Sequence, residues 1–257
     1  MDWPNDLLRD IFNDPDTPNK IRKRIRRELK PTEVDYRGCR MRIHPADNNT
    51  EFQIWRMGRT QEERALRHIL KDLPKDRPIV AYDVGANAGA HTLRLAAVAA
   101  PGSVIHAFEP NPVMRARLEE NIRLNAFDCI RVHDCAVSDN SGEMELFVPA
   151  QGNLGLARLG EPMRGANGIS VQVRTLTEFM PADPDTPIDL VKVDVEGQED
   201  RVLAPLITEA SATQKPKAIF FELQHERFWS VDIAGILEQN GYELRGKFGR
   251  NALYRLT

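Results

Sequence analysis

The hydrophobic and polar positions of the chain follow two alternating patterns from residue 79 onward. Short runs of consecutive apolar residues are separated by segments in which apolar residues recur every three or four positions. Continuous apolar runs predict strands buried on both faces, and the longer period predicts helices that pack against them. The predicted strands are 79–83, 104–108, 130–137, 143–148, 171–176, 188–194 and 218–223. The predicted helices are 90–99, 114–124, 199–206 and 233–239, followed by a closing hairpin of 241–248 and 253–256.

This alternation predicts an α/β fold built on a doubly wound, mostly parallel sheet. Residues 79–257 carry the whole pattern, so we expect them to form one Rossmann-like domain. Residues 1–75 follow a different pattern and are expected to form an N-terminal α+β extension, joined to the domain by a linker at 75–78.

The N-terminal extension combines amphipathic and basic segments. The apolar residues of 7–12 have the spacing of a short helix, and the run 20–30 is strongly basic with a narrow apolar stripe. A basic run of this kind is usually a solvated helix face, and contact with a polyanion is the alternative. A hairpin is expected at 34–43, and Thr60 with Glu63 has the form of a capping box that starts the next helix.

The segment after residue 137 is expected to turn and form a second hairpin. The turn falls at 138–142, so that 130–137 would pair with 143–148. Residues 149–170 contain five glycines and are long for a connection inside a compact domain. Loops of this length are often lids or binding loops.

Composition narrows the classes of function. The formal net charge of −3 argues against a dedicated nucleic-acid binder, because such proteins are usually strongly basic. The three cysteines form an odd number without metal-ligand spacing, which favours a reducing, cytoplasmic location. No apolar run approaches the length of about 18 residues that a membrane span needs. The first six residues lack the form of a signal peptide, so we expect no leader.

A glycine-rich turn follows the first predicted strand of the domain. The apolar run 79–83 ends at Asp83, passes Gly85 and Gly89, and then becomes helical. A strand, a glycine turn and a helix in this order are typical of a nucleotide-type cofactor site. Glycine has no Cβ, so the backbone N–H groups of such a turn can approach a ligand closely.

Acidic residues stand at the carboxyl ends of several predicted strands. Asp83, Glu109, Asp194 and Glu222 each follow an apolar run. Ligands of parallel sheets bind at this edge, and carboxylates there are costly unless something pairs with them. A ligand that carries a positive charge and hydroxyl groups would satisfy the whole set.

Two cofactors are candidates for this turn, a dinucleotide and S-adenosylmethionine. The turn lacks the middle glycine of the dinucleotide fingerprint, and Asp83 would repel a pyrophosphate. S-adenosylmethionine has no phosphate; Asp83 could pair with its ammonium, and the backbone N–H groups of the turn could hold its carboxylate. Glu109 lies 20 residues beyond Gly89 and could accept both ribose hydroxyls. These points favour the methyl donor.

Four motifs follow the predicted strands: Asp-Val-Gly-Ala-Asn-Ala-Gly-Ala-His-Thr at 83–92, Phe-Glu-Pro-Asn-Pro at 108–112, Ala-Val-Ser-Asp at 136–139 and Val-Lys-Val-Asp-Val-Glu-Gly-Gln-Glu at 191–199. Together they resemble the FkbM family of class I S-adenosylmethionine-dependent methyltransferases. The resemblance covers residues 79–257, with a weaker similarity at 44–47. It implies a seven-stranded sheet with an antiparallel last strand. It also implies transfer of a methyl group to a hydroxyl of a sugar or secondary metabolite, so we expect a small-molecule or carbohydrate acceptor.

The expected cofactor site is drawn from these motifs and from the strand ends. Two interpretations of Cys135 are possible: it is a small buried apolar side chain, or it forms part of the wall of the adenine pocket. A contact between His91 and the cofactor carboxylate is a further option. The expected cofactor-binding residues are Asp83, Gly85, Ala86, Asn87, Gly89, His91, Thr92, Glu109, Pro110, Asn111, Cys135, Ala136 and Asp194.

The expected catalytic residues are His225, Glu196 and Asp194, which follow the last two apolar strands of the parallel series. A sugar hydroxyl is a weak nucleophile, so a general base or a metal ion would assist it. His225 is the favoured base, and Glu196 is expected rather to cap the next helix or to bind substrate. A metal held by Asp194 and Glu222 is conceivable, but no metal is predicted. The candidates for the acceptor pocket are Trp55, Phe228, Trp229 and the loop 149–170.

The sequence leaves further functions open. An RNA-modifying methyltransferase could use the basic run 20–30, although the Asn/Asp-Pro-Pro-aromatic motif of base amino methylation is absent. No cysteine stands beside a proline, as the methylation of cytosine carbon would need. An NAD-dependent oxidoreductase and an inactive binding module are also compatible with the sequence, as is a homodimer.

Overall fold

The computed structural model describes residues 4–257, so residues 1–3, with which the predicted extension begins, lie outside the described residues. A seven-stranded sheet has the order β12-β13-β11-β10-β3-β4-β5. Its strands are β3 (Val80–Val84), β4 (Val104–Phe108), β5 (Ile130–His133), β10 (Leu190–Val193), β11 (Ala218–Glu222), β12 (Tyr242–Phe248) and β13 (Asn251–Leu256).

The sheet is mixed. β5, β4, β3, β10 and β11 pair in parallel, and β13 pairs antiparallel with both β11 and β12. This confirms the expected seven strands, the antiparallel last strand and the closing hairpin. The carboxyl ends of β3, β4, β10 and β11 therefore meet at one edge of the sheet, where ligands of such folds bind.

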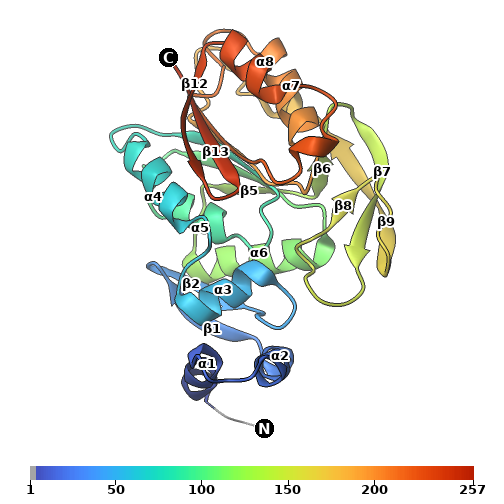
Figure 1. Cartoon of the computed structure of the whole chain (residues 1–257). Helices are drawn as coiled ribbons and strands as arrows, with labels where there is room; N and C mark the ends of the chain where they lie inside the picture. Colours follow the sequence, from blue (N-terminus) through green and yellow to red (C-terminus); the bar gives the residue numbers. More distant parts are fainter. Residues whose placement is uncertain (1–3) are drawn as a thin grey trace.

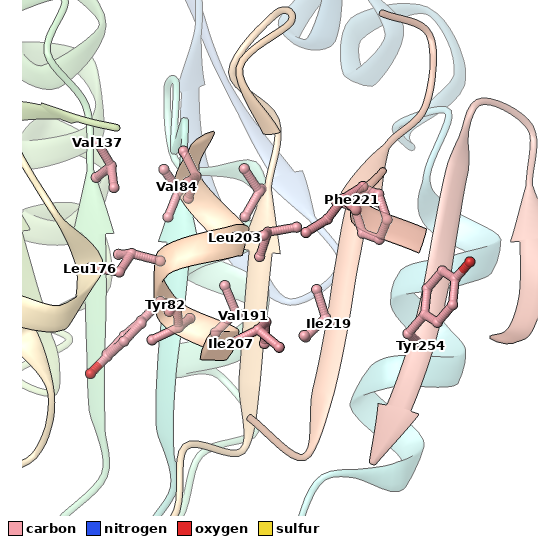
Figure 2. Close-up of a cluster of buried hydrophobic side chains, with 14 of the residues drawn as sticks. Tyr82, Val84, Val137, Leu176, Val191, Leu203, Ile207, Ile219, Phe221 and Tyr254 are labelled. Carbon is pink, nitrogen blue, oxygen red and sulfur yellow. The ribbon is translucent and has the colours of Figure 1, made fainter. Parts of the chain in front are cut away.

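Helices cover both faces of this sheet, because successive side chains of a buried strand point to opposite sides. Val191 and Val193 pack with α7 and α8 on one face, whereas Leu190 packs with α4, α5 and α6 on the other. Figure 2 shows the first face, where Leu203 and Ile207 of α7 lie against the strands. The helices are α4 (Glu63–Asp72), α5 (Ala90–Ala96), α6 (Pro112–Asn125), α7 (Glu199–Glu209) and α8 (Ile233–Gln239).

The N-terminal extension contains the helices predicted near 7–12 and 20–30 and the predicted hairpin. In Figure 1 it lies at the end of the molecule opposite to α7 and α8. A further helix, α3, was not predicted. It begins after Asn48, whose side chain accepts a hydrogen bond from the Glu51 N–H. The elements are α1 (Asn5–Asn13), α2 (Asn19–Glu28), β1 (Thr32–Tyr36), β2 (Cys39–Ile43) and α3 (Asn49–Met57).

The extension is packed against the sheet domain. Its apolar residues, among them Trp55 and Met41, share one cluster with Leu93 of α5. A buried ionic group adds to this contact: Arg117 of α6 binds both carboxylate oxygens of Asp47 and one of Glu51, all within 2.9 Å. A division of the chain into two folding domains at 76–78 stays a prediction.

The predicted capping box before α4 is wrong. The helix begins at Glu63, with Glu62 at its N-cap and no side-chain cap bond. The Thr60 hydroxyl is buried and has no hydrogen-bond partner among residues 4–257. Glu63 turns away to Arg94 and Arg37, whose charges attract its carboxylate more than a backbone N–H does.

The predicted strand 130–137 is two strands, and the predicted hairpin with 143–148 is wrong. β5 pairs with β4 only as far as His133, opposite Phe108, where β4 ends. The chain beyond has no neighbour in that sheet and joins a second one of order β6-β9-β7-β8. The predicted loop 149–170 therefore contains β8 and the start of β9. These strands are β6 (Cys135–Val137), β7 (Gly142–Pro149), β8 (Arg158–Leu159) and β9 (Ala166–Arg174).

The longest helix of the described residues 4–257 is α6, with 14 residues. None of the helices in this range is long and apolar enough to cross a membrane.

Arg117→Ala should lower the free energy of unfolding by about 3 kcal/mol, because it leaves the buried carboxylate of Glu51 without its cationic partner. Burial raises the pKa of Glu51 to about 7 even against the charge of Arg117. Urea denaturation would measure the change. Arg40→Ala removes an exposed pair with Glu33 and should change stability by less than about 1 kcal/mol. Equal losses in both variants would show that the Arg117 group does not anchor the extension.

Candidate active site

A cavity of about 420 Å³ lies at the carboxyl ends of β3, β4, β10 and β11. Strand ends form one side of it, and α3 and the segment 153–157 form the other. The predicted cofactor residues that line it are Gly85, Ala86, Asn87, His91, Glu109, Pro110, Cys135, Ala136 and Asp194. Asp83, Gly89, Thr92 and Asn111 are not among the described residues that line it.

Asp83 is bound inside the protein. Its carboxylate lies 3.0 Å from the Lys192 ammonium and accepts a 2.6 Å hydrogen bond from the Thr92 hydroxyl. Burial alone would raise the pKa of Asp83, but Lys192 and then His91 outweigh burial and lower it. Burial alone would lower the pKa of Lys192, and Asp83 raises it. The expected pairing of Asp83 with a cofactor ammonium therefore competes with an ion pair that already exists.

Lys192 lines the cavity, but it was not among the site residues predicted from the sequence. It stands in the apolar strand β10 and is 5 % exposed. Its ammonium also donates to the Gly85 carbonyl at 2.8 Å, so it fixes the turn after β3. A lysine inside an otherwise apolar run was the signal available, because a buried lysine almost always has a charged partner.

Gly85 is required by the protein rather than by a ligand. It has a φ of +76°, and a Cβ at this position would stand 1.9 Å from the Asp194 carbonyl oxygen. At Gly89, a Cβ would meet Leu118 at 2.7 Å. The two glycines thus let the turn pack against β10 and α6, which is a different reason from the ligand approach that the sequence suggested.

The backbone N–H groups of the turn are already used within the chain. Gly85 and Ala86 both donate to the Phe108 carbonyl, and Gly89 donates to the Ala86 carbonyl. The Asn87 N–H binds Glu109, and the Ala88 N–H binds the side chain of Asn87. The predicted cradle of free amides for a carboxylate is therefore not supported.

Glu109 is turned into the cavity at the end of β4. Its two oxygens accept the N–H groups of Asn87 and Asn111, each at 2.8 Å. Burial raises the pKa of Glu109 to about 7, although these two bonds act in the opposite direction. Each carboxylate oxygen keeps a second lone pair for a ligand hydroxyl.

His91 offers a second group for a ligand. It lines the cavity, and its buried Nε2 has no hydrogen-bond partner in the described part of the chain. Burial, and then the charge of Lys192, lower the pKa of His91, so the ring is neutral near pH 7. Its nitrogen can therefore donate to or accept from a ligand according to its tautomer.

Cys135 is 5 % exposed and also lines the cavity, so both readings of this residue agree with its position. Burial raises the pKa of its thiol to about 11. The side chain is therefore an uncharged wall of the site at neutral pH.

The far side of the cavity is closed by asparagines from distant parts of the chain. The Asn48 side chain donates to that of Asn87 at 2.8 Å, and the Asn49 N–H donates to the side chain of Asn153. Leu154 adds two backbone bonds, one to Asp47 and one from Asn111. The expected role of the loop 149–170 in the pocket is consistent with this geometry.

The three aromatic candidates for the acceptor pocket lie elsewhere among the described residues. Trp55 is 1 % exposed within the cluster of the extension. Trp229 donates its indole N–H to Glu199, and Phe228 is exposed at the surface. None of the three lines the cavity of the described chain.

Glu196, Glu222 and His225 form a cluster beside Asp194 (the cluster is called the acid–histidine cluster below). The His225 Nε2 lies 3.2 Å from Glu196 and 4.0 Å from Glu222. Burial, and then the charge of Asp194, raise the pKa of Glu196 to about 8 and that of Glu222 to about 7. Burial, and then the charge of Arg158, lower the pKa of His225.

Glu196 does not cap the following helix. It adopts a left-handed φ of 58°, which is uncommon for a residue other than glycine. Glu199 instead accepts the N–H groups of Val195 and Gly197 and so fixes the turn that presents Glu196. The turn aims the Glu196 carboxylate at the imidazole of His225.

A cavity at the carboxyl ends of parallel strands is typical of α/β proteins that bind a nucleotide-type cofactor. Comparison with known families is more specific: the model of the methyltransferase FkbM domain matches residues 83–244. The chain belongs to the FkbM family of methyltransferases.

Several named relatives are similar to this chain. The hexuronic acid methyltransferase AglP of Haloferax volcanii is 30 % identical over 190 residues, which are 73 % of this chain and 72 % of that protein. The 2-O-methyltransferase NoeI of Sinorhizobium fredii is 29 % identical, over 56 % of this chain and 64 % of its own. The 31-O-demethyl-FK506 methyltransferase FkbM of Streptomyces tacrolimicus is 34 % identical, over 54 % and 62 %. The matches thus span somewhat less than two thirds of NoeI and of FkbM.

The solved structure of a methyltransferase FkbM from Methylobacillus flagellatus is also similar. It has a TM-score of 0.47 and 18 % identity, and the match covers 86 % of this chain and 62 % of that one.

Gly85→Ala should cost about 2–4 kcal/mol of stability, since its methyl group collides with the Asp194 carbonyl in addition to the strained φ. Gly38→Ala is the matched control: its φ is +84°, but nothing lies within 4 Å, so only about 1 kcal/mol is expected. Denaturant unfolding of both variants would separate the collision from the backbone strain. Similar losses of stability in the two variants would mean that the backbone at Asp194 can move away from the added methyl group without a measurable change in the free energy of unfolding.

Proposed function

We propose that the chain is an S-adenosylmethionine-dependent O-methyltransferase with the doubly wound sheet of class I enzymes. The observation that carries this is Glu109, which is buried at the end of β4 and turned into the cavity beside the turn 85–89. A carboxylate in this place can accept both hydroxyls of a ribose. Cytoplasmic location is part of the proposal and rests on the cysteine count.

The proposed partners of the methionine part of the cofactor differ from those predicted from the sequence. The turn amides are already bound, so the carboxylate of the cofactor would be held by His91 Nε2 and the charge of Lys192. Asp83 is paired with Lys192, so the ammonium would be held by Asp194, which lines the cavity. The direct contact between Asp83 and the cofactor is replaced here by an indirect one through Lys192.

The proposed acceptor is a small molecule or carbohydrate with a free hydroxyl. The wall opposite the strands is polar, with Asn49, Thr50 and Gln53 of α3 and Gln61 before α4. Amide and hydroxyl side chains bind sugar hydroxyls through hydrogen bonds. The names of NoeI, FkbM and AglP, which refer to O-methylation or to a sugar acid, support this class of acceptor.

The bound cofactor would supply a methyl group on a sulfonium, ready for displacement by an oxygen. The chain has to align the acceptor hydroxyl, exclude water and take up its proton. Asp194, Glu196 and His225 are the proposed groups for this work. His225 has a lowered pKa and is neutral near pH 7, so it can accept a proton, and Glu196 beside it would stabilise the resulting charge.

The RNA-modifying alternative has less support. Several charged side chains of the basic helix α2 already have partners within the chain. Arg22 donates to the Asp14 carbonyl, and Arg24 donates to Glu28. Arg26 binds Asn49 and lies over the ring of Phe52. An NAD-dependent oxidoreductase would need free backbone N–H groups in the turn 85–89 to bind the pyrophosphate of its cofactor. Those N–H groups already donate hydrogen bonds within the chain, which argues against this function.

Glu109→Gln should weaken the binding of S-adenosylhomocysteine about tenfold, because it removes a charge-assisted acceptor of the ribose hydroxyls. In the wild type the ionised form of Glu109 is the one that accepts, and its pKa is raised to about 7. Affinity should therefore fall as the pH is lowered from 8 to 6, and Glu109→Gln should lose this dependence. Isothermal titration calorimetry across this range would measure both. Wild-type affinity in the variant would refute the placement of the ribose, and binding of NAD in its place would favour an oxidoreductase.

His225→Ala should lower turnover at least about 100-fold, with S-adenosylhomocysteine affinity kept within about twofold. The measurement is transfer of a radiolabelled methyl group to a panel of sugars and glycosides with free hydroxyls. Glu143→Gln, an exposed change on β7, is the control and should match the wild type. Undiminished turnover in His225→Ala would remove this residue from catalysis. Label recovered in RNA rather than in the panel would favour the RNA-modifying function.

A further inference from the structure

We propose that the acid–histidine cluster of Glu196, Glu222 and His225 binds one divalent cation of the Mg²⁺ and Mn²⁺ type after the carboxyl ends of β10 and β11. Glu196 and Glu222 line the cavity there, and His225 lies behind them, outside the described lining. The role given to the ion rests on the proposed function, because it would hold the acceptor hydroxyl. No metal ion was predicted from the sequence, which placed Asp194 rather than Glu196 beside Glu222.

The geometry of the three side chains suits a single ion. Each residue offers one ligand atom, and these atoms all lie within 4.8 Å of one another. Ligand atoms at about 2.1 Å from a common octahedral ion stand about 3 Å apart when adjacent and about 4.2 Å apart when opposite. The His225 Nε2 lies 3.2 Å from Glu196 and 4.0 Å from Glu222, within that range.

The cluster has no cation of the described chain in direct contact, unlike Asp83; the charges of Arg158 and Arg250 only reduce the rise in the pKa of Glu196 and of Glu222, respectively. Asp83 has Lys192, whereas no lysine or arginine of residues 4–257 forms an ion pair with Glu196 or Glu222. Arg250 lines the same cavity but is bound to the side chain of Gln224. The side chains of Glu196 and Glu222 are 17 % and 15 % exposed. Largely buried carboxylates without such a partner are costly, and a cation is the ligand that would stabilise them.

One polar atom of the cluster, the Glu222 Oε2, indicates a ligand between its side chains. The Glu222 Oε2 is buried, lies on the side of the imidazole, and has no hydrogen-bond partner in the described chain. His225 is 5 % exposed, and its Nε2 stands between the two carboxylates. The His225 Nε2 contacts the side chains of Glu196 at 3.2 Å and Gln224 at 3.1 Å, and a bound ion would replace these contacts. Buried polar atoms are nearly always satisfied, so an unsatisfied carboxylate oxygen facing an imidazole indicates a missing ligand.

The chemical nature of the three ligand atoms indicates which kinds of cation the site would bind. Two carboxylate oxygens and one imidazole nitrogen suit a hard or borderline cation and leave positions open for other oxygens. An acceptor hydroxyl bound at such a position would have a lowered pKa. With the ion bound, the imidazole nitrogen that faces it would be a ligand, so the role of His225 would change from taking up the proton to holding the ion. Asp194 on the cavity wall, which the proposed function also assigns to the cofactor ammonium, would then be the proton acceptor.

The test is Mn²⁺ binding, followed by electron paramagnetic resonance and calorimetry on the full-length chain. The wild type should bind about one Mn²⁺, and Glu222→Gln and His225→Ala should each weaken binding by at least tenfold. Glu143→Gln, an exposed acid on β7, should bind as the wild type does. Circular dichroism would confirm that the variants are folded. Absence of saturable binding in the wild type, or equal binding in Glu222→Gln, would overturn the site.

A second measurement separates this inference from the proposed function. S-adenosylhomocysteine should bind with the same affinity, within about twofold, to protein treated with a chelator, because its proposed partners are Glu109, His91, Lys192 and Asp194, none of which is a proposed ligand of the ion. Cofactor binding without Mn²⁺ binding would refute the metal site and leave the proposed function standing. Mn²⁺ binding without cofactor binding would refute the proposed function. Methyl transfer that persists at full rate after chelation would overturn the role of the ion.

Discussion

The ion pair between Asp83 and Lys192 is the interaction on which the site depends. The two residues are register partners on β3 and β10, the central strands of the sheet, and both are almost fully buried. Removing two charges from water is costly, so neither can be lost without leaving the other uncompensated. The Lys192 ammonium also binds the Gly85 carbonyl, which ties the turn after β3 to β10. The strand ends and the turn that line the cavity are thus fixed by the ion pair and by the hydrogen bond of Lys192, without a ligand.

The acidic residues at the strand ends look equivalent in the sequence, but their partners divide them into three kinds. Asp83 is neutralised by a lysine and serves the fold. Glu109 is held by two backbone N–H groups, which orient it and leave it free to accept hydroxyls. Glu196 and Glu222 have only an imidazole between them. The same side-chain chemistry is thus stabilised in three ways, by a lysine, by backbone N–H groups or by an imidazole, and the proposed roles of these acids follow this division.

The sheet and its helices could be predicted from the sequence because the strands are continuous apolar runs whose burial does not depend on distant residues. α3 was missed because its start depends on Asn48, whose side chain also bonds to Asn87, 39 positions away. The division of 130–137 was missed for a similar reason: β5 ends where its neighbour β4 ends, which only the register shows. Local patterns predict elements, and tertiary neighbours decide where they stop.

Most of the predicted cofactor residues line the cavity, but the contacts that they make could not be predicted from the sequence. A glycine-rich turn suggests free amides, yet whether those amides are free depends on the Phe108 carbonyl and the Glu109 carboxylate of the next strand. Likewise, Glu196 reads as a helix cap until Glu199 is seen to bind the amides around it. Because Glu199 fixes that turn from within, the left-handed Glu196 is already aimed at His225 without a ligand. Such preorganisation reduces the ordering cost that binding would otherwise carry.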